Sequence, residues 1–164
     1  NSVAILSGNE SEEDLRNLAS DIFSYFGLGC RNVSKLYVPA GYNFNFLFNA
    51  FQSWGHLMDH NKYMNNYDYH RAVYLMNREP FLTNNFVILK ESEHTASPVS
   101  VVHYHVYENE RALRLHLEEI KDKLQCIVSN AENDIPFGKT QQPELWDYAD
   151  GVDTLKFLID FGGN

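Results

Sequence analysis

One cysteine lies where a nucleophile would be useful, in a short loop framed by glycines. Cys30 follows Gly27 and Gly29 and precedes Arg31, between a segment with helical periodicity and a segment typical of a strand. Only the thiolate attacks electrophiles, and a cation such as Arg31 or Lys35 would stabilise it if directed toward the sulfur. The glycines would let a substrate approach the backbone, where N–H groups stabilise an oxyanion. Cys30 is therefore the candidate nucleophile, and the alternative is a small buried side chain in a turn.

Other reactive side chains have weaker patterns. Cys126 lies between apolar residues and is expected in the core. His103 and His105 alternate on a strand-like segment and therefore share one face, but such a pair binds zinc only when a third ligand comes from elsewhere. A half-exposed strand face is the simpler interpretation, and no metal site is predicted. We expect His60 and His70 at the surface, with acid–base chemistry as the alternative.

Charged residues cluster after another predicted strand, where sites of α/β proteins collect. Glu91, Glu93 and His94 follow the apolar segment 86–89. A carboxylate at this position would orient a cofactor hydroxyl group, and the alternative is a solvated charged turn. The sequence contains no glycine-rich dinucleotide motif, P-loop or nucleophile elbow, so it shows no nucleotide-binding motif of its own.

Alternating strands and helices must position these groups. Short apolar segments predict strands over residues 2–6, 35–38, 86–89, 99–107 and 126–128. Apolar residues at helical spacing, beginning with a Ser11 N-cap, predict helices over residues 11–26, 44–57, 61–77 and 108–124, with an irregular or short helical tail over 145–158. This order predicts an α/β fold with a mainly parallel sheet and flanking helices. Because no linker rich in Gly, Ser or Pro interrupts it, residues 1–164 are expected to form a single domain.

Composition excludes several classes of function. A chain of 164 residues with 44% hydrophobic and 21% charged residues is typical of one globular domain and argues against disorder. The net charge of −9 repels phosphate backbones, so no nucleic-acid partner is expected. No apolar segment has the length of a membrane helix, and no secretory signal is visible. Two cysteines make no disulfide framework, which favours a cytoplasmic location.

Several segments, in this order, resemble the aldehyde dehydrogenase superfamily. The residues SVAIL at 2–6, the acidic helix that follows, GLGC at 27–30 and KLYV at 35–38 resemble the strand, helix, nucleophile loop and strand of that family. The residues IPFGK at 135–139 resemble its Pro-Phe-Gly loop. The resemblance implies an aldehyde-dehydrogenase-like catalytic domain in which Cys30 is the nucleophile.

Nearly the whole chain is similar, more closely, to the bacterial long-chain fatty acyl-CoA reductases of bioluminescence. The segments 61–69 and 143–151 carry this further resemblance. It implies acyl-CoA as substrate, NADPH as hydride donor and an acyl-cysteine thioester on Cys30. The family's general-base glutamate, its oxyanion asparagine and its cofactor-binding domain lie upstream of the part that this chain resembles. Residues 1–164 alone are therefore expected to be inactive in reduction.

The same resemblance places one cofactor contact in this chain. The family's second glutamate, which meets the nicotinamide ribose, falls at Glu93, although His94 stands at the family's offset from Pro98. An aromatic stripe would line an acyl tunnel, but its helical spacing is more typical of core packing; it consists of Phe44, Phe48, Phe51 and Trp54. A cysteine hydrolase or acyltransferase activated by a histidine and a non-catalytic α/β binding module are the alternatives. The oligomeric state is left open, with a homo-oligomer among the alternatives.

Overall fold

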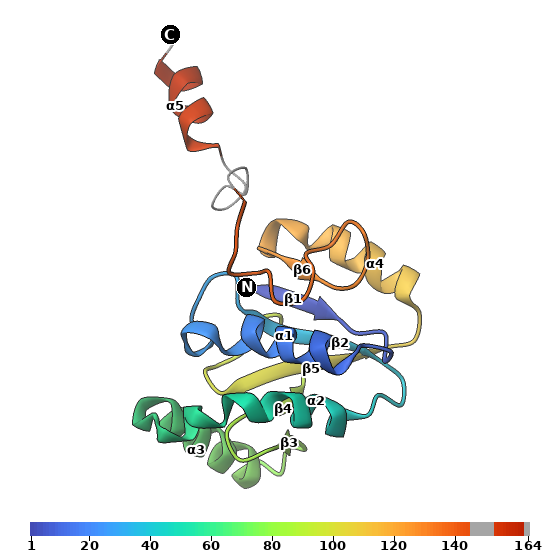
Figure 1. The fold of residues 1–164 in the computed structure, drawn as a ribbon, viewed down its shortest axis with the longest axis vertical. Coiled ribbons are helices and arrows are strands. Elements are labelled where there is room, and N and C mark those ends of the chain that lie inside the picture. The colour runs from blue at the N-terminus through green and yellow to red at the C-terminus, as the bar shows by residue number, and fades with distance from the viewer. Residues whose placement is uncertain (145–152, 163–164) are drawn as a thin grey trace.

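A six-stranded sheet forms the centre of the computed structural model, which describes residues 1–144 and 153–162 (Figure 1). Its strand order is β3-β4-β5-β2-β1-β6. The strands are β1 (Ser2–Ile5), β2 (Val33–Pro39), β3 (Leu82–Thr83), β4 (Ile88–Glu91), β5 (Val101–Tyr107) and β6 (Ile127–Val128). Every neighbouring pair is parallel except β3 with β4. The predicted α/β fold with a mainly parallel sheet is confirmed.

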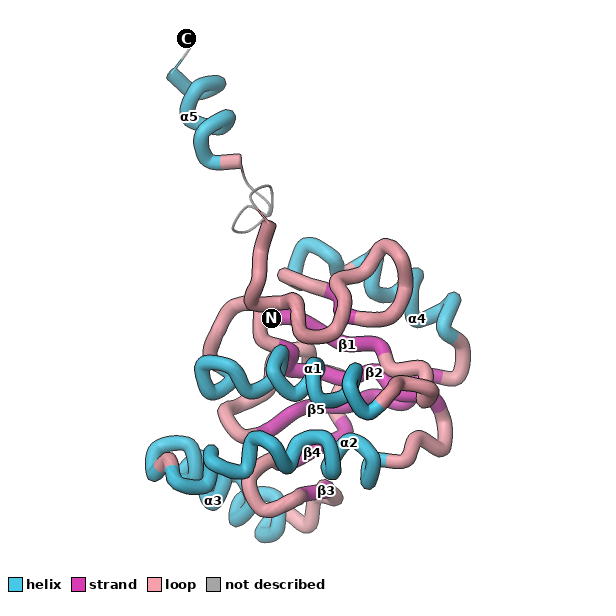
Figure 2. Tube along the Cα trace, viewed as in Figure 1, coloured by secondary structure: helices cyan, strands magenta, loops and turns pink. Residues whose placement is uncertain are grey.

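Helices connect most of the strands, and turns or loops join β3 to β4 and β4 to β5 (Figure 2). The α-helices are α1 (Glu12–Phe23), α2 (Phe44–Phe51), α3 (Asn61–Met76), α4 (Glu110–Glu119) and α5 (Thr154–Gly162). Three 3₁₀ segments in the described ranges are η1 (Ser24–Gly27), η2 (Gln52–Asp59) and η3 (Lys121–Lys123). Among these helices none is long and apolar enough to cross a membrane. The predicted tail falls partly on residues 145–152, which lie outside the described residues, as does most of the 143–151 segment.

The two faces of the sheet carry different apolar clusters because side chains alternate along each strand. On the near face in Figure 1, α1 and α2 pack against Ala4 and Leu36. On the other face, α4 packs Leu113 and Leu117 against alternate strand residues, including Tyr37. Because η1 follows α1 directly, the loop between η1 and β2 lies beside the C-terminal end of α1, where β2 begins.

Side-chain hydrogen bonds to the nearby backbone set the boundaries of α1 and β4. The Ser11 N-cap is confirmed, because its hydroxyl accepts from the Asp14 N–H while the Asp14 carboxylate accepts from the Ser11 N–H. The strand predicted at 86–89 begins only at Ile88. Backbone groups of Val87 are bound by the side chains of Thr83 and Asn84, which form a turn in place of a strand ladder.

Phe44, Phe48, Phe51 and Trp54 pack in or against the core, whereas Phe46 is exposed. Phe51 is fully buried and meets Phe23 edge to face, with ring centroids 5.0 Å apart. Phe44 packs against Tyr104 at 4.8 Å. Cys126 is also buried, as predicted. The helical spacing of these aromatic residues therefore reflects packing between α2 and the sheet.

Candidate functional site

The side chain of Cys30 is exposed, in the loop between η1 and β2. It lies beyond the N-terminal end of β2, where Val33 starts the strand. The alternative of a small buried side chain therefore does not describe this residue. An exposed thiol on a loop is accessible to an incoming thioester, which is the first requirement for a nucleophile.

A buried amide clamps this loop. Asn32 is 2% exposed, and its Nδ2 donates to the carbonyls of Asp21 (2.9 Å), Ile22 (3.1 Å) and Ser24 (2.9 Å). Its Oδ1 accepts from the Gly29 N–H at 2.7 Å. The amide thus supplies partners to carbonyls that the C-terminal end of α1 leaves unpaired, and it fixes the residue before Cys30. This role of Asn32 is not predictable from the sequence, because a single asparagine after a turn carries no distinctive pattern.

The backbone before Cys30 is constrained. Tyr25 (φ 54°), Phe26 (φ 60°) and Gly27 (φ +75°) are consecutively left-handed, which costs about 1–2 kcal/mol for each non-glycine residue. A Cβ added to Gly29 would lie 2.5 Å from Oδ1 of Asn32, so glycine is required there by the clamp. Such strain persists only where surrounding contacts fix the backbone, and it is characteristic of functional loops.

The Pro-Phe-Gly segment lies against the same loop. Asp21, which is 1% exposed, accepts from the N–H of Gly138 (2.6 Å) and from the N–H (3.1 Å) and hydroxyl (2.8 Å) of Thr140. Burial raises the pKa of Asp21, and these hydrogen bonds act in the opposite direction. Arg31 Nε donates to the Thr140 carbonyl at 2.6 Å. The chain around Gly138 is thereby tied both to α1 and to the residue after Cys30.

Lys35, the second cation near Cys30 in the sequence, points toward the segment after β4. Lys35 is 1% exposed, and its Nζ donates to the Glu93 carbonyl at 2.8 Å while lying 4.9 Å from the centre of the Tyr37 ring. Burial lowers the pKa of Lys35. Its ammonium group therefore holds the segment after β4 and makes no contact with Cys30.

The charged segment after β4 crosses the face of the sheet that α4 also covers. The carbonyl of His94 is 3.0 Å from Nδ1 of His103, and the Ser34 hydroxyl donates to the carbonyl of Thr95 at 2.7 Å. The Glu93 side chain is 84% exposed, with Oε1 at 3.2 Å from Nδ1 of His105. Three carbonyls of this segment are thus held by strand side chains, and the Glu93 carboxylate projects outward.

Cys30 and Glu93 are not in contact. His105, the partner of Glu93, is paired in register with Tyr37, which lies four residues beyond Val33 on β2. At about 3.3 Å per residue, this corresponds to roughly 13 Å along the strand from the end that Cys30 precedes. Within the described residues, the structure brings Cys30 together with Asn32, Arg31 and the Pro-Phe-Gly segment, and Glu93 together with His105.

The histidines do not form a site with Cys30. Among the described residues, no hydrogen bond joins the Cys30 sulfur to an imidazole, and no three His, Cys, Asp or Glu side chains are arranged to hold a metal ion. His103 is buried and its pKa is lowered by burial, so the expected half-exposed face holds only for His105. His60 is exposed, as expected, and its ring lies tilted against Phe26 with centroids 4.4 Å apart, whereas His70 is partly buried.

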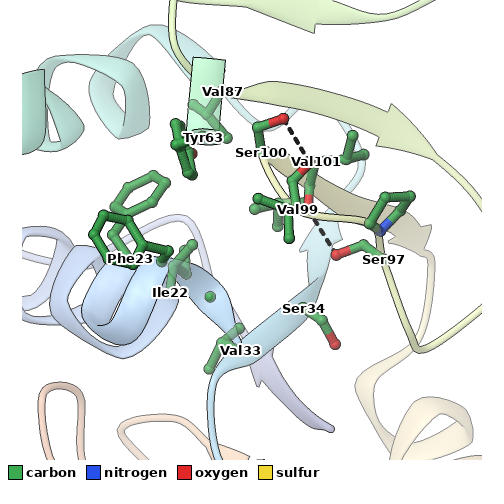
Figure 3. A pocket seen from close by; sticks show the side chains of 14 residues that line it. Ile22, Phe23, Val33, Ser34, Tyr63, Val87, Ser97, Val99, Ser100 and Val101 are labelled. Carbon is green, nitrogen blue, oxygen red and sulfur yellow. Dashed lines mark hydrogen bonds between the residues drawn. The ribbon is translucent and has the colours of Figure 1, made fainter. Parts of the chain in front are cut away.

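A small cavity of about 20 Å³ lies beside the Cys30 loop, between the end of α1, the start of β2 and residues 97–102 (Figure 3). Phe23, Val33 and Val99 form apolar parts of its wall. The hydroxyl of Tyr63, also in the wall, is buried without a hydrogen-bond partner among the described residues. This volume accommodates a water molecule but not an acyl chain.

Comparison with known proteins matched the sequence to no family model and to no curated protein.

Proposed function

We propose that this chain is the nucleophile-bearing catalytic part of a cytoplasmic, NADPH-dependent acyl-CoA reductase of the aldehyde dehydrogenase superfamily. The observation that carries the proposal is the exposed Cys30 thiol on a loop clamped by Asn32, with the Pro-Phe-Gly segment tied against it. The order of these segments in the sequence supports the family, and their contact supports a shared site.

The first step transfers an acyl group to Cys30. The Cys30 thiolate attacks the thioester carbonyl carbon of acyl-CoA, a new C–S bond forms, and the bond to the coenzyme A sulfur breaks. Coenzyme A leaves as a thiolate and takes a proton. The Cys30 N–H, which has no hydrogen bond to a described residue, is available to the oxyanion of this step.

The second step reduces the acyl-Cys30 thioester. When bound, NADPH supplies a hydride to the thioester carbonyl carbon. The C–S bond to Cys30 then breaks, the aldehyde leaves, and the thiol is restored with one proton from solvent. The hydrolase alternative needs an imidazole within hydrogen-bond reach of the Cys30 sulfur, and no described histidine is hydrogen-bonded to it.

The resemblance assigns one residue of this chain, Glu93, to the cofactor, but the described residues do not bring Glu93 to Cys30. The Glu93 carboxylate is exposed, and only Oε1 is paired, with His105. A carboxylate with an open oxygen accepts hydrogen bonds from vicinal hydroxyls. A ribose held by Glu93 would, however, lie roughly 13 Å along the strands from the end that Cys30 precedes. No residue of this chain is assigned to the phosphates of the cofactor.

Acylation tests the proposal without requiring reduction. The full chain is incubated with radiolabelled acyl-CoA, and protein-bound label is counted for wild type, Cys30→Ser and Cys126→Ala. We expect label on wild type and on Cys126→Ala, whose buried thiol is inaccessible, and none on Cys30→Ser. Label retained by Cys30→Ser, or no label on folded wild type, contradicts the proposal.

A further inference from the structure

The chain between β4 and β5 forms a strap, residues 92–100, across the face of the sheet that α4 also covers. Three consecutive backbone carbonyls of the strap accept hydrogen bonds from strand side chains. The donors are Nζ of Lys35 (2.8 Å), Nδ1 of His103 (3.0 Å) and the hydroxyl of Ser34 (2.7 Å). Lys35 is 1% exposed and His103 is 6% exposed. The strap therefore covers two basic side chains and is held to the sheet by both.

The end of the strap reaches the small cavity beside the Cys30 loop. Ser97, Val99 and Ser100 form part of the wall of this cavity (Figure 3). Ser100 is 5% exposed and has a φ of 64°, a left-handed conformation that is unfavourable for a residue with a Cβ. Such a conformation persists only while surrounding contacts hold it. Release of the strap would therefore relax Ser100 and loosen this wall of the cavity.

A row of basic side chains crosses three strands beneath the strap. His103 on β5 is paired in register with Lys35 on β2 and with Lys90 on β4. Paired residues on adjacent strands, which lie about 4.8 Å apart, project to the same face, so His103 stands between two lysine side chains. Lys90 is paired with Glu79 at 2.8 Å, whereas Lys35 donates to a neutral carbonyl. Protonation of His103 would therefore add a third positive charge to this row.

The closed strap disfavours a charged His103. Burial lowers the pKa of His103, and the charges of Lys35, His94 and Lys90 lower it further, although the hydrogen bond to the His94 carbonyl acts in the opposite direction. Because a carbonyl oxygen only accepts, Nδ1 carries the proton of the neutral ring and a second proton is added at Nε2. With the pKa in the closed structure below the ordinary value of 6.5, the closed strap is fully stable above pH 6.5 and loses stability as the pH falls below it.

The other titratable histidines near His103 do not have this effect. The His94 side chain lies exposed on the strap itself, so its protonation requires no opening. His105, two residues along β5, has Nδ1 at 3.2 Å from the Glu93 carboxylate. A proton on His105 would strengthen that pair and hold the strap closed. Protonation of His103 is therefore the event that favours an open strap.

We propose that residues 92–100 form a pH-sensitive strap, which opens when His103 takes up a proton. Opening gives the imidazolium access to water and releases Ser100 from its left-handed conformation. The small cavity beside the Cys30 loop then loses one wall, so acidification changes the surroundings of that loop. The inference concerns the strap alone and is independent of acyl transfer to Cys30.

Hydrogen exchange of the ¹⁵N-labelled full chain, followed by NMR between pH 7.5 and pH 5.5, tests the proposal. The protection factor divides the intrinsic exchange rate by the observed rate and so removes the direct effect of pH on exchange. The N–H groups of Ser92, Val101 and Ile88 donate to carbonyls in or beside the strap. We expect their protection to fall by up to about tenfold for each pH unit below 6.5. The Leu6 N–H, which bonds to Tyr37 between β1 and β2, should keep its protection.

Two variants assign the response to His103. His103→Asn keeps a donor near the Nδ1 position but takes up no proton, so its strap amides should keep their protection at low pH. Lys90→Met removes one flanking charge, which raises the pKa of His103 toward its ordinary value and should make the pH dependence smaller. The matched control His116→Asn, at an exposed histidine of α4, should respond as wild type.

The proposal is overturned if protection of the strap in wild type does not change with pH, or if His103→Asn responds as wild type. If His103→Asn does not fold, a response of Lys90→Met equal to that of wild type overturns it. Cys30→Ser is expected to respond like wild type, so loss of acylation does not affect this result.

Discussion

Removal of the Asn32 side chain tests how the Cys30 loop is held. The amide makes four hydrogen bonds of 2.7–3.1 Å while 2% exposed. In Asn32→Ala, three carbonyls and the Gly29 N–H lose these partners. A buried hydrogen bond contributes about 1 kcal/mol net, and water entering at the surface recovers part of the loss. We therefore expect the free energy of unfolding to fall by about 3 kcal/mol.

Urea unfolding followed by circular dichroism measures this change. With a slope of about 2 kcal/mol per molar urea, the midpoint of Asn32→Ala should fall by roughly 1.5 M. Asn65→Ala is the matched control, since Asn65 is exposed on α3, and its free energy of unfolding should change by less than about 0.5 kcal/mol. Equal midpoints for the two variants would show that the Asn32 amide contributes nothing to the stability of the loop.

Three further predictions concern the same region. Gly29→Ala places a Cβ 2.5 Å from the Asn32 amide oxygen and should lower the free energy of unfolding by about 2 kcal/mol. In the control Gly55→Ala, the nearest contact of the added Cβ is 3.7 Å, so the change should be nearly neutral. Similar urea midpoints for the two variants would count against the Asn32 clamp. Because burial raises the pKa of Asp21 in the fold, its stabilisation is full below the ordinary pKa of 3.8 and is lost as pH rises through the folded pKa. The free energy of unfolding of wild type minus that of Asp21→Asn should therefore decrease from pH 3.5 to 7 in urea titrations, and an increase would contradict the assigned cause. Iodoacetamide should modify exposed Cys30 in the native chain and buried Cys126 only after unfolding, as peptide mass spectrometry would show; equal native labelling would contradict the burial of Cys126.

Local patterns predict the elements of this fold because their causes are local. The capping box at Ser11 and Asp14 and the apolar spacing of α1 and α4 depend on residues three or four apart. The alternation of these helices with short apolar strands then limits the sheet to a mainly parallel arrangement. The boundary at Ile88 could not be predicted, since it depends on Thr83 and Asn84 side chains that bind the backbone of Val87.

The candidate site was only partly predictable. The glycines around Cys30 indicate a tight loop, but the Asn32 clamp joins a loop to carbonyls eight to eleven residues earlier. The contact between Asp21 and Thr140 spans more than a hundred residues. Lys35 stands near Cys30 in sequence, yet alternation along β2 directs it to the sheet face beneath Glu93. Such contacts depend on tertiary packing, which spacing along the chain does not encode.

Identification of the acylated residue shows whether Cys30 is the nucleophile. The native chain is incubated with acyl-CoA, treated with or without hydroxylamine, which cleaves thioesters, and analysed by peptide mass spectrometry. We expect one acyl group on the peptide that contains Cys30, released by hydroxylamine, and an unmodified Cys126 peptide. An acyl group on any other residue, or a Cys30 peptide that stays unmodified in the folded chain, would contradict it.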